Sequence, residues 1–380
     1  MVEEGDLILW LVGEIYQAAL EPGRWPALLE SIGDLFGGAA GIMAVLAPPT
    51  GPTFAATACL DPALLTTLAQ RHADPDTNPT LGRILRLPVG QPAIGAKFHD
   101  GQEFLRSAAY NDMLRPQGLQ DGAAALLLRE PDHVVTWNVM QPAGAEPMGR
   151  PEEDLLLVLT PHLRRAAQLL LRLDALRTRA DAAEEALDRL PMGVILVSAA
   201  GRPIRLNRAA EAIVAEGDGL RARRDGLVAA RPDETRALDR LIADAAATGA
   251  GRGIGSGGTL ALSRPSGGAP LPVLVAPCRG ERLADGRDWP AAVVFVGDPE
   301  RQTSTPADLL RRLYGLTRAE ARLAALLLQG RDLAEAAREL EVSLHTVRAH
   351  LKAVLAKTGA ARQAELVRIL LRGPAGLLPG

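Results

Sequence analysis

Two helix-start signals near the end of this 380-residue chain leave little freedom in how that part can fold. Thr317 is followed three positions later by Glu320, and Asp332 is followed in the same way by Glu335. At this spacing the two side chains cap the first backbone N–H groups of a helix reciprocally. Gly330 between the two signals is a typical helix stop. The sequence therefore predicts one helix that ends before Gly330 and a second, shorter helix that starts after Asp332.

A three-residue turn follows the second helix. It consists of residues 341–343, and Ser343 can cap a third helix that Gly359 ends. A fourth helix is expected in the segment "RQAELVRILLR", residues 362–372. Two helices joined by a turn of this length have the helix-turn-helix spacing. We therefore expect an all-α, four-helix module at residues 313–372.

The third helix has three faces. Its apolar face is expected in the core of the module and comprises Leu344, Val347, Leu351, Val354 and Leu355. The adjacent exposed face carries, at positions i, i+3, i+4 and i+7, the residues His345, Arg348, Ala349 and Lys352. A third flank carries Thr346, His350 and Lys357. A solvated surface helix is the simpler interpretation, but such a helix normally mixes in acids, and none occurs from Val342 to Ala364.

The distribution of charge points to an anionic partner for this module. Residues 306–372 hold 12 Arg and Lys against 7 Asp and Glu, whereas the rest of the chain holds 30 against 38. In the major groove of DNA, Arg and Lys can donate to guanine, and a small apolar side chain can contact the thymine methyl group. Hydroxyls, cations and a helix N-terminus suit phosphates. We expect base contacts from His345, Arg348, Ala349 and Lys352, and DNA-backbone contacts from Ser343, Thr346, His350 and Lys357.

Residues 316–370 resemble the LuxR/GerE-type helix-turn-helix of bacterial transcription regulators. The resemblance rests on the Leu-Thr-x-x-Glu opening, the Gly330 stop, the Thr-Val-Arg-x-His-Leu run and the Lys-Thr-Gly ending. It implies base contacts at Arg348, Ala349 and Lys352, backbone contacts at Ser343, Thr346 and Lys357, and dimerisation through the fourth helix, here Leu366 and Leu370. Two departures are Arg318, where the family usually has proline, and Ala336-Ala337, where it has isoleucine-alanine. Neither position touches DNA in the family.

A long helix is expected at residues 160–190. Apolar residues recur there at alternating steps of three and four: Ala166, Leu169, Leu173, Leu176, Ala180, Ala183, Leu187 and Leu190. This heptad pattern is typical of a parallel coiled coil. We expect dimerisation through Leu169, Leu173, Leu176 and Leu187. The alternative is an amphipathic helix packed on its own domain.

The segments on either side of this helix mix helical and strand patterns. In residues 1–159 helices are expected at 7–20 and 25–36, and strands at 40–47, 123–130 and 133–141. In residues 191–300 we expect strands at 194–197 and 203–206, a helix after Asn207, a helix at 233–247, and strands at 259–263, 271–276 and 291–296.

This order of elements resembles a PAS domain in residues 191–300. The stretches "EFLRSAAYNDMLRPQGL" and "LTPHLRRAAQL" are similar to a GAF-like sensory region. The expected fold is therefore multidomain: α+β sensory domains, GAF-like and PAS-like, joined by a long helix, and an all-α DNA-binding domain. Residues 301–312 are expected as a linker and 373–380 as a tail.

Other patterns argue against a catalytic or metal site. Cys59 and Cys278 form neither a metal spacing nor a disulfide framework, and no nucleophile elbow, Walker loop or HExxH motif occurs. The glycines of "GAGRGIGSGGT" follow a helix and precede a strand, so they predict a loop rather than a dinucleotide site. Four aromatic residues of the first segment could line a pocket or fill the core: Trp10, Trp25, Trp137 and Tyr110. No cofactor is expected.

The function that fits these patterns is a dimeric, sequence-specific regulator that binds double-stranded DNA and is modulated by its sensory domains, with a small-molecule effector left open. The alternatives are an enzyme that processes a small molecule, or an interaction scaffold, each with an accessory DNA-binding module. The acidic N-terminus and the lack of about 20 consecutive apolar residues predict a cytoplasmic protein without a membrane partner.

Overall fold

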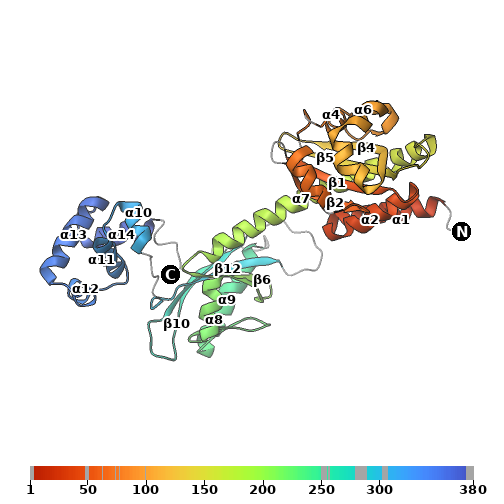
Figure 1. Cartoon of the computed structure of the whole chain (residues 1–380). Coiled ribbons are helices and arrows are strands. Elements are labelled where there is room, and N and C mark those ends of the chain that lie inside the picture. Colours follow the sequence, from red (N-terminus) through yellow and green to blue (C-terminus); the bar gives the residue numbers. More distant parts are fainter. Residues whose placement is uncertain are drawn as a thin grey trace. The chain divides into compact units, whose positions relative to one another are not determined.

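The computed structural model describes residues 4–47, 51–61, 63–72, 74–76, 78–98, 100–249, 255, 257–278, 289–301 and 307–373. The chain divides into two compact units, Met1–Arg179 and Ala180–Gly380, each of which is described by itself (Figure 1).

The first unit is an antiparallel sheet with helices on both faces. Its helices are α1 (Glu4–Leu20), α2 (Trp25–Leu35), α3 (Ala63–Thr67), α4 (Pro79–Ile84), α5 (Gly95–Phe98), α6 (Gly101–Arg106) and the first part of α7 (Arg150–Asp188). Its strands are β1 (Ala40–Ala47), β2 (Gly51–Ala58), β3 (Pro92–Ile94), β4 (Leu119–Arg129) and β5 (Val134–Pro142), in the order β2-β1-β5-β4-β3. The expected helices and strands of this segment are present. The strands β2 and β3 were not expected, because both open on proline or glycine-proline, which is typical of a turn.

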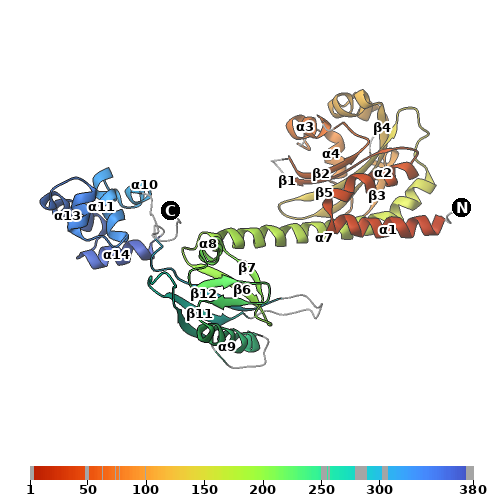
Figure 2. The ribbon, with the colours of Figure 1, turned by 90° about the horizontal axis from the view of Figure 1, so that it is seen from below.

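The two faces of this sheet carry different kinds of side chain, because successive residues of a strand point to opposite sides. Large residues such as Met43, Leu127 and Trp137 lie in one core with α1, α2 and the first half of α7. On the opposite face, Ile42 and Leu46 form a smaller cluster with residues that include Leu81 of α4. Helix α1 lies alongside α7 (Figure 2), and a hydrogen bond of 3.2 Å joins Tyr16 Oη to His162 Nδ1.

Helix α7 starts at Arg150, ten residues before the expected position. Leu156, Leu159, Leu163, Ala166 and Leu170 are buried in the core of the first unit. Ala166, the first position of the expected heptad pattern, is therefore already covered by its own domain, and the alternative of an amphipathic helix holds for this half.

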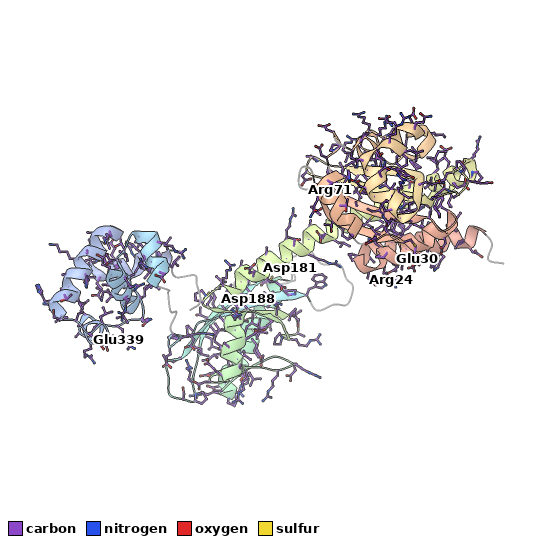
Figure 3. All side chains as sticks on the ribbon, viewed as in Figure 1. Arg24, Glu30, Arg71, Asp181, Asp188 and Glu339 are labelled. Atoms are coloured by element: carbon purple, nitrogen blue, oxygen red, sulfur yellow. The ribbon has the colours of Figure 1, made fainter. Side chains whose placement is uncertain are left out.

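The second half of α7 is largely exposed. Leu169 and Leu176 are 38% and 60% accessible to solvent, and Leu173 is half-buried. Charged side chains such as Asp181 project from this part of the helix (Figure 3). In the described part of the chain no helix is long and apolar enough to cross a membrane.

The central domain has a second five-stranded antiparallel sheet. Its elements are β6 (Gly193–Ser198), β7 (Pro203–Leu206), α8 (Arg208–Glu216), β8 (Leu220–Ala222), β9 (Leu227–Ala229), α9 (Pro232–Gly249), β10 (Gly258–Leu262), β11 (Leu271–Pro277) and β12 (Pro290–Val296). The sheet order is β10-β11-β12-β6-β7, and β8 and β9 pair separately. The expected strands and helices are confirmed. Of the glycine-rich loop, Gly253 lies outside the described residues, and Gly258 opens β10 directly after the loop.

Asn207 ties this domain to the end of α7. Its side-chain oxygen accepts hydrogen bonds from the backbone N–H groups of Val194 and Ala210, at 2.8 and 3.0 Å. Its amide nitrogen donates to the carbonyl oxygens of Leu187 and Met192, at 2.8 and 3.0 Å. One buried side chain thus caps α8 and joins this helix to the end of α7 and to the start of β6.

The terminal module consists of helices α10 (Ala307–Tyr314), α11 (Arg318–Leu328), α12 (Leu333–Glu339), α13 (Leu344–Thr358) and α14 (Gln363–Arg372). Helix α10 occupies part of the expected 301–312 linker, and its Leu310 is fully buried in the core of the module. Residues 302–306 of that linker and 374–380 of the expected tail lie outside the described residues.

The expectation that Leu366 and Leu370 dimerise the protein is wrong for these two side chains. Both are completely buried in the core of their own module. The apolar spacing that suggested an interface with a second chain is the inner face of α14.

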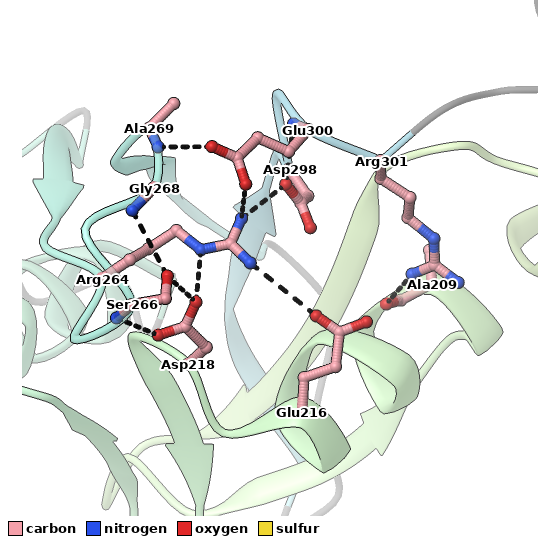
Figure 4. A network of polar contacts seen from close by, with 10 residues as sticks. All are labelled: Ala209, Glu216, Asp218, Arg264, Ser266, Gly268, Ala269, Asp298, Glu300 and Arg301. Carbon is pink, nitrogen blue, oxygen red and sulfur yellow. Dashed lines mark hydrogen bonds and ion pairs between the residues drawn. The ribbon is translucent and has the colours of Figure 1, made fainter.

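A network of ion pairs closes one end of the central domain (Figure 4). Arg264 Nε lies 2.7 Å from Asp218 Oδ2, and one of its terminal nitrogens lies 2.8 Å from Asp298 Oδ1. The hydroxyl of Ser266 donates to Asp218 over 2.6 Å. The Ser266 hydroxyl and the Arg264 guanidinium lower the pKa of Asp218 from 3.8 to about 2. The network joins the segments before β8, after β10 and after β12.

Replacement of Arg264 by methionine is expected to loosen this domain, because it leaves the carboxylates of Asp218 and Asp298 close together without a cation. Hydrogen exchange in β10 and β11 of the full chain should accelerate by at least about tenfold at pH 7.

The pKa of Asp218 is depressed in the folded state, so the stability that it contributes is present above pH 4 and lost as the pH falls towards 2. In acid the effect of the substitution should therefore shrink. Arg231→Met, which removes an exposed ion pair with Asp233, is the control and should leave exchange unchanged. Equal exchange in the Arg264 variant and the wild type would contradict this account.

Candidate nucleic-acid interface

Both expected capping boxes are present in the terminal module. Thr317 N–H donates to Glu320 Oε2 over 2.7 Å, and Glu320 N–H donates to the Thr317 hydroxyl over 3.3 Å. The corresponding distances between Asp332 and Glu335 are 2.8 and 2.7 Å. These local contacts fix where α11 and α12 begin.

The turn between α12 and α13 has the expected length. Glu341 adopts the left-handed conformation, with φ of 57°, and Val342 N–H donates to the carbonyl of Ala337 over 3.0 Å. Ser343 then caps α13, because its hydroxyl accepts from Thr346 N–H over 3.1 Å. The chain changes direction within these three residues, and α13 packs against α11, α12 and α14 (Figure 1).

Helix α13 is anchored by part of the face that was expected in the core. Val347 and Val354 are completely buried, and Leu351 and Leu355 are partly buried against them. Leu344 is different: it is 38% exposed. It lies in the first turn of α13, next to Ser343, which is itself exposed. The buried contact therefore starts one turn later than expected.

The adjacent face of α13 is free. His345, Arg348, Ala349 and Lys352 are all exposed. Neither Arg348 nor Lys352 has an ion-pair or hydrogen-bond partner for its side chain among the residues that the structure describes. In the same module Arg311, Arg331 and Arg368 each pair with an acid, whereas the exposed Arg338 of α12 also has no such partner among the described residues. Arg348 and Lys352 are thus available to an external acceptor.

The first turn of α13 gathers donors for an anion. The Ser343 and Thr346 hydroxyl oxygens lie 2.8 Å apart, and the helix N-terminus beside them presents backbone N–H groups. No acid lies in this first turn. His350 is half-buried one turn further along. This arrangement can bind a phosphate oxygen beside the exposed face of the helix.

Lys357, which was expected at the DNA backbone, has a partner within the protein. Its Nζ lies 2.6 Å from Glu320 Oε2, and that carboxylate is buried. Burial by itself disfavours the charged form of Glu320, but hydrogen bonds from Lys357 and Thr317 outweigh it and hold the pKa of Glu320 below its ordinary value. Lys357 thereby joins the end of α13 to the start of α11. The sequence offered no signal for this pair, because its members are 37 residues apart.

The two lysines of α13 should therefore respond differently to substitution by methionine. Lys357→Met leaves the buried Glu320 carboxylate without its cation and should destabilise the module by about 1–2 kcal/mol at pH 7, a value reduced because the lysine is one-third exposed. Lys352→Met should leave stability unchanged within about 0.5 kcal/mol. Urea denaturation of both variants, followed by hydrogen exchange in α11 and α13, measures the difference. Equal stability of the two variants would show that the contact with Glu320 is not structural.

Comparison with known proteins assigns this part of the chain to a family. Residues 315–370 match the family of bacterial regulatory proteins of the luxR type, called GerE. No curated protein sequence matches the chain.

Solved structures give weaker likenesses over longer stretches. The Vibrio cholerae VqmA dimer, a LuxR-type receptor, is 16% identical, with 50% of this chain and 87% of that chain covered and a TM-score of 0.21. Escherichia coli SdiA is 11% identical, with 94% and 92% covered and a TM-score of 0.31. The E. coli DhaR(N)–DhaL complex is 12% identical, with 75% and 85% covered and a TM-score of 0.30. At residues 315–370 the chain carries a GerE-type domain of the luxR family of bacterial regulatory proteins.

Proposed function

We propose that this protein is a sequence-specific transcriptional regulator that binds double-stranded DNA as a homodimer and is modulated by its two N-terminal domains. The observation that carries the proposal is the exposed face of α13, on which Arg348 and Lys352 have no partner within the described chain. This face lies in the helix-turn-helix of a luxR-family domain.

In the proposed complex, α13 enters the major groove of DNA. His345, Arg348, Ala349 and Lys352 face the base edges, and the guanidinium of Arg348 can bind the O6 and N7 acceptors of a guanine. Ser343, Thr346 and His350 lie beside the phosphates. We assign Lys357 to holding α13 on α11 rather than to the DNA backbone, since its ammonium already contacts Glu320.

The homodimer is proposed to form through the second half of α7. Leu169, Leu173 and Leu176 continue the helix beyond the core of the first unit and keep apolar surface accessible there. Leu187 is half-buried and continues the same spacing. A two-fold protein would present two copies of α13 to two half-sites of a near-palindromic sequence.

The sensory role is proposed from the architecture of the first two domains. The central domain has the two strands, helices and three further strands that are typical of a PAS domain. The first unit has the same strand order in its sheet, which supports a related, GAF-like sensory domain.

The DNA interface is tested first by selection of genomic fragments with the full-length protein at two salt concentrations. Binding should enrich one near-palindromic motif. Arg348→Ala should then weaken binding to that motif by about 1–3 kcal/mol while leaving the melting temperature unchanged. Arg338→Ala, which removes an exposed arginine of α12, is the matched control. Full retention of specific affinity in a folded Arg348 variant would remove this residue from the base-contacting set.

The dimer is tested by placing a charge on the exposed helix. Leu173→Asp combined with Leu176→Asp should convert the protein to a monomer and weaken binding to a two-half-site operator by at least about tenfold, because the second module then binds without its tether. Thr178→Asp, on the same exposed turns but outside the apolar spacing, should leave the dimer intact. Sedimentation velocity measures the mass. A dimer that persists in the double variant would place the interface elsewhere.

A further inference from the structure

The first unit contains a cavity on the side of its sheet that faces away from α1, α2 and α7. It has a volume of about 130 Å³ and lies between β1, β4 and β5 on one side and α4, α6 and residues 109–114 on the other. An apolar cavity of about 150 Å³ is large enough to take up benzene. The space is therefore close in volume to one that holds a small ring.

The sheet leaves this space because its residues are small there. Ala44, Ala124 and Gly122 line the cavity, whereas their neighbours on the other face include Met43 and Trp137. Close packing normally fills such a face with larger side chains. Gly122 cannot be enlarged, because a Cβ there would lie 1.8 Å from the carbonyl oxygen of Val139. The hollow is thus built into the strands themselves.

Polar groups without partners point to the chemistry of a ligand. Thr136 lies on β5 among the lining residues and is only 3% exposed, yet its hydroxyl has no hydrogen-bond partner in the part of the chain described. The side chains of Asn138, two residues further along β5, and of Tyr110, on the opposite wall, also line the cavity without such a partner among the described residues. A hydroxyl that faces an apolar cavity without a protein partner can bond to a ligand there, and that hydrogen bond stabilises the complex.

Charge limits the class of ligand. None of the lining residues is an acid, a lysine, an arginine or a histidine. A charged molecule would lose its hydration in this cavity without gaining an ion pair, which is strongly unfavourable. Asn78, another polar residue of the lining, already has hydrogen-bond partners within the protein. Its amide nitrogen donates to the backbone carbonyl of His72, and its side-chain oxygen accepts from the backbone N–H of Leu81 at the start of α4. The groups left for a ligand are therefore neutral: the side chains of Thr136 and Asn138 on β5, of Tyr110, and of Thr80 on α4.

We propose that this cavity binds a neutral, mainly apolar molecule the size of one substituted ring, with a hydroxyl or carbonyl group that bonds to Thr136 and Asn138. Of the four aromatic residues considered from the sequence, only Tyr110 lines this site. Trp25 and Trp137 are buried in the core on the other face, and Trp10 is exposed on α1.

The position of the site connects it to the proposed regulation. The strand that presents Thr136 and Asn138 to the cavity presents Val135, Trp137 and Val139 to the core that holds the first half of α7. A ligand that orders β5 therefore acts on the packing of the helix that we propose to dimerise. This regulatory consequence rests on the proposed function, whereas binding itself does not.

Binding is tested on the full chain, without DNA, with three probes of one shape: benzyl alcohol, toluene and benzoate. Benzyl alcohol should raise the melting temperature and give a saturable calorimetric signal. Toluene should bind more weakly because it leaves Thr136 unpaired, and benzoate should not bind. Thr136→Val should weaken benzyl alcohol binding about 3–10-fold and leave toluene binding unchanged or stronger. Asn138→Ala, which removes the second side chain that the ligand is proposed to bond to, is the second variant if the first does not fold, and the same selective loss of benzyl alcohol binding is expected.

The control is Thr57→Val, the same substitution on β2 outside the cavity, which should leave all three affinities unchanged. The proposal would be overturned if neither benzyl alcohol nor toluene bound the wild-type protein. It would also be overturned if the wild type bound the two probes equally well and the cavity variants did not change either affinity. Operator affinity with and without benzyl alcohol is measured separately. A protein that binds the alcohol but no DNA would refute the proposed function and leave the cavity assignment standing.

Discussion

The burial of the first half of α7 determines much of the remaining architecture. Six of its apolar side chains, from Leu156 to Leu170, complete the core of the first unit, so the direction of the helix is fixed there by packing. The same 39-residue helix continues well beyond that core. At its end, Asn207 holds the carbonyl of Leu187 while capping α8. One helix thus contributes side chains to the core of the first unit, and its last turn is bonded to the central domain.

The two sheets show how one strand order can be used in different ways. Both have the order second, first, fifth, fourth, third when only the strands of each five-stranded sheet are counted. In the first unit both faces are covered, and one of them is hollow. In the central domain α8, α9 and the β8–β9 pair cover one face, and residues of the other face, such as Leu274, remain accessible. The two domains therefore differ in the second face of the sheet: in the first unit helices cover it and leave a cavity, and in the central domain part of it is accessible. The strand order does not determine this difference.

What the sequence predicted well is local. Caps and turn residues act within three or four positions, and the starts of α11, α12 and α13 were therefore predicted to the residue. Errors arose where the answer depends on distant parts of the chain. The spacing of Leu366 and Leu370 shows an apolar face but not whether its own core or a second chain covers it. Lys357 looked like its neighbour Lys352, and only the fold brings Glu320 to one of them. The cavity could not be predicted from the sequence for the same reason. Small residues on a strand leave a cavity only if the segments packed on the other side do not fill the space, and those segments are distant in the sequence.

The separation of the two faces of the first sheet has an evolutionary consequence. Substitutions at Ala44 or Ala124 change the volume and shape of the cavity without altering the side chains that pack against α1, α2 and α7. In the proposed site, such substitutions would change which ligand fits, whereas the side chains that hold the first half of α7 would stay the same. Successive residues of the same strands thus serve two purposes: one set lines the cavity and the other set packs in the core. A single substitution in the first set would change the proposed ligand without changing a core side chain.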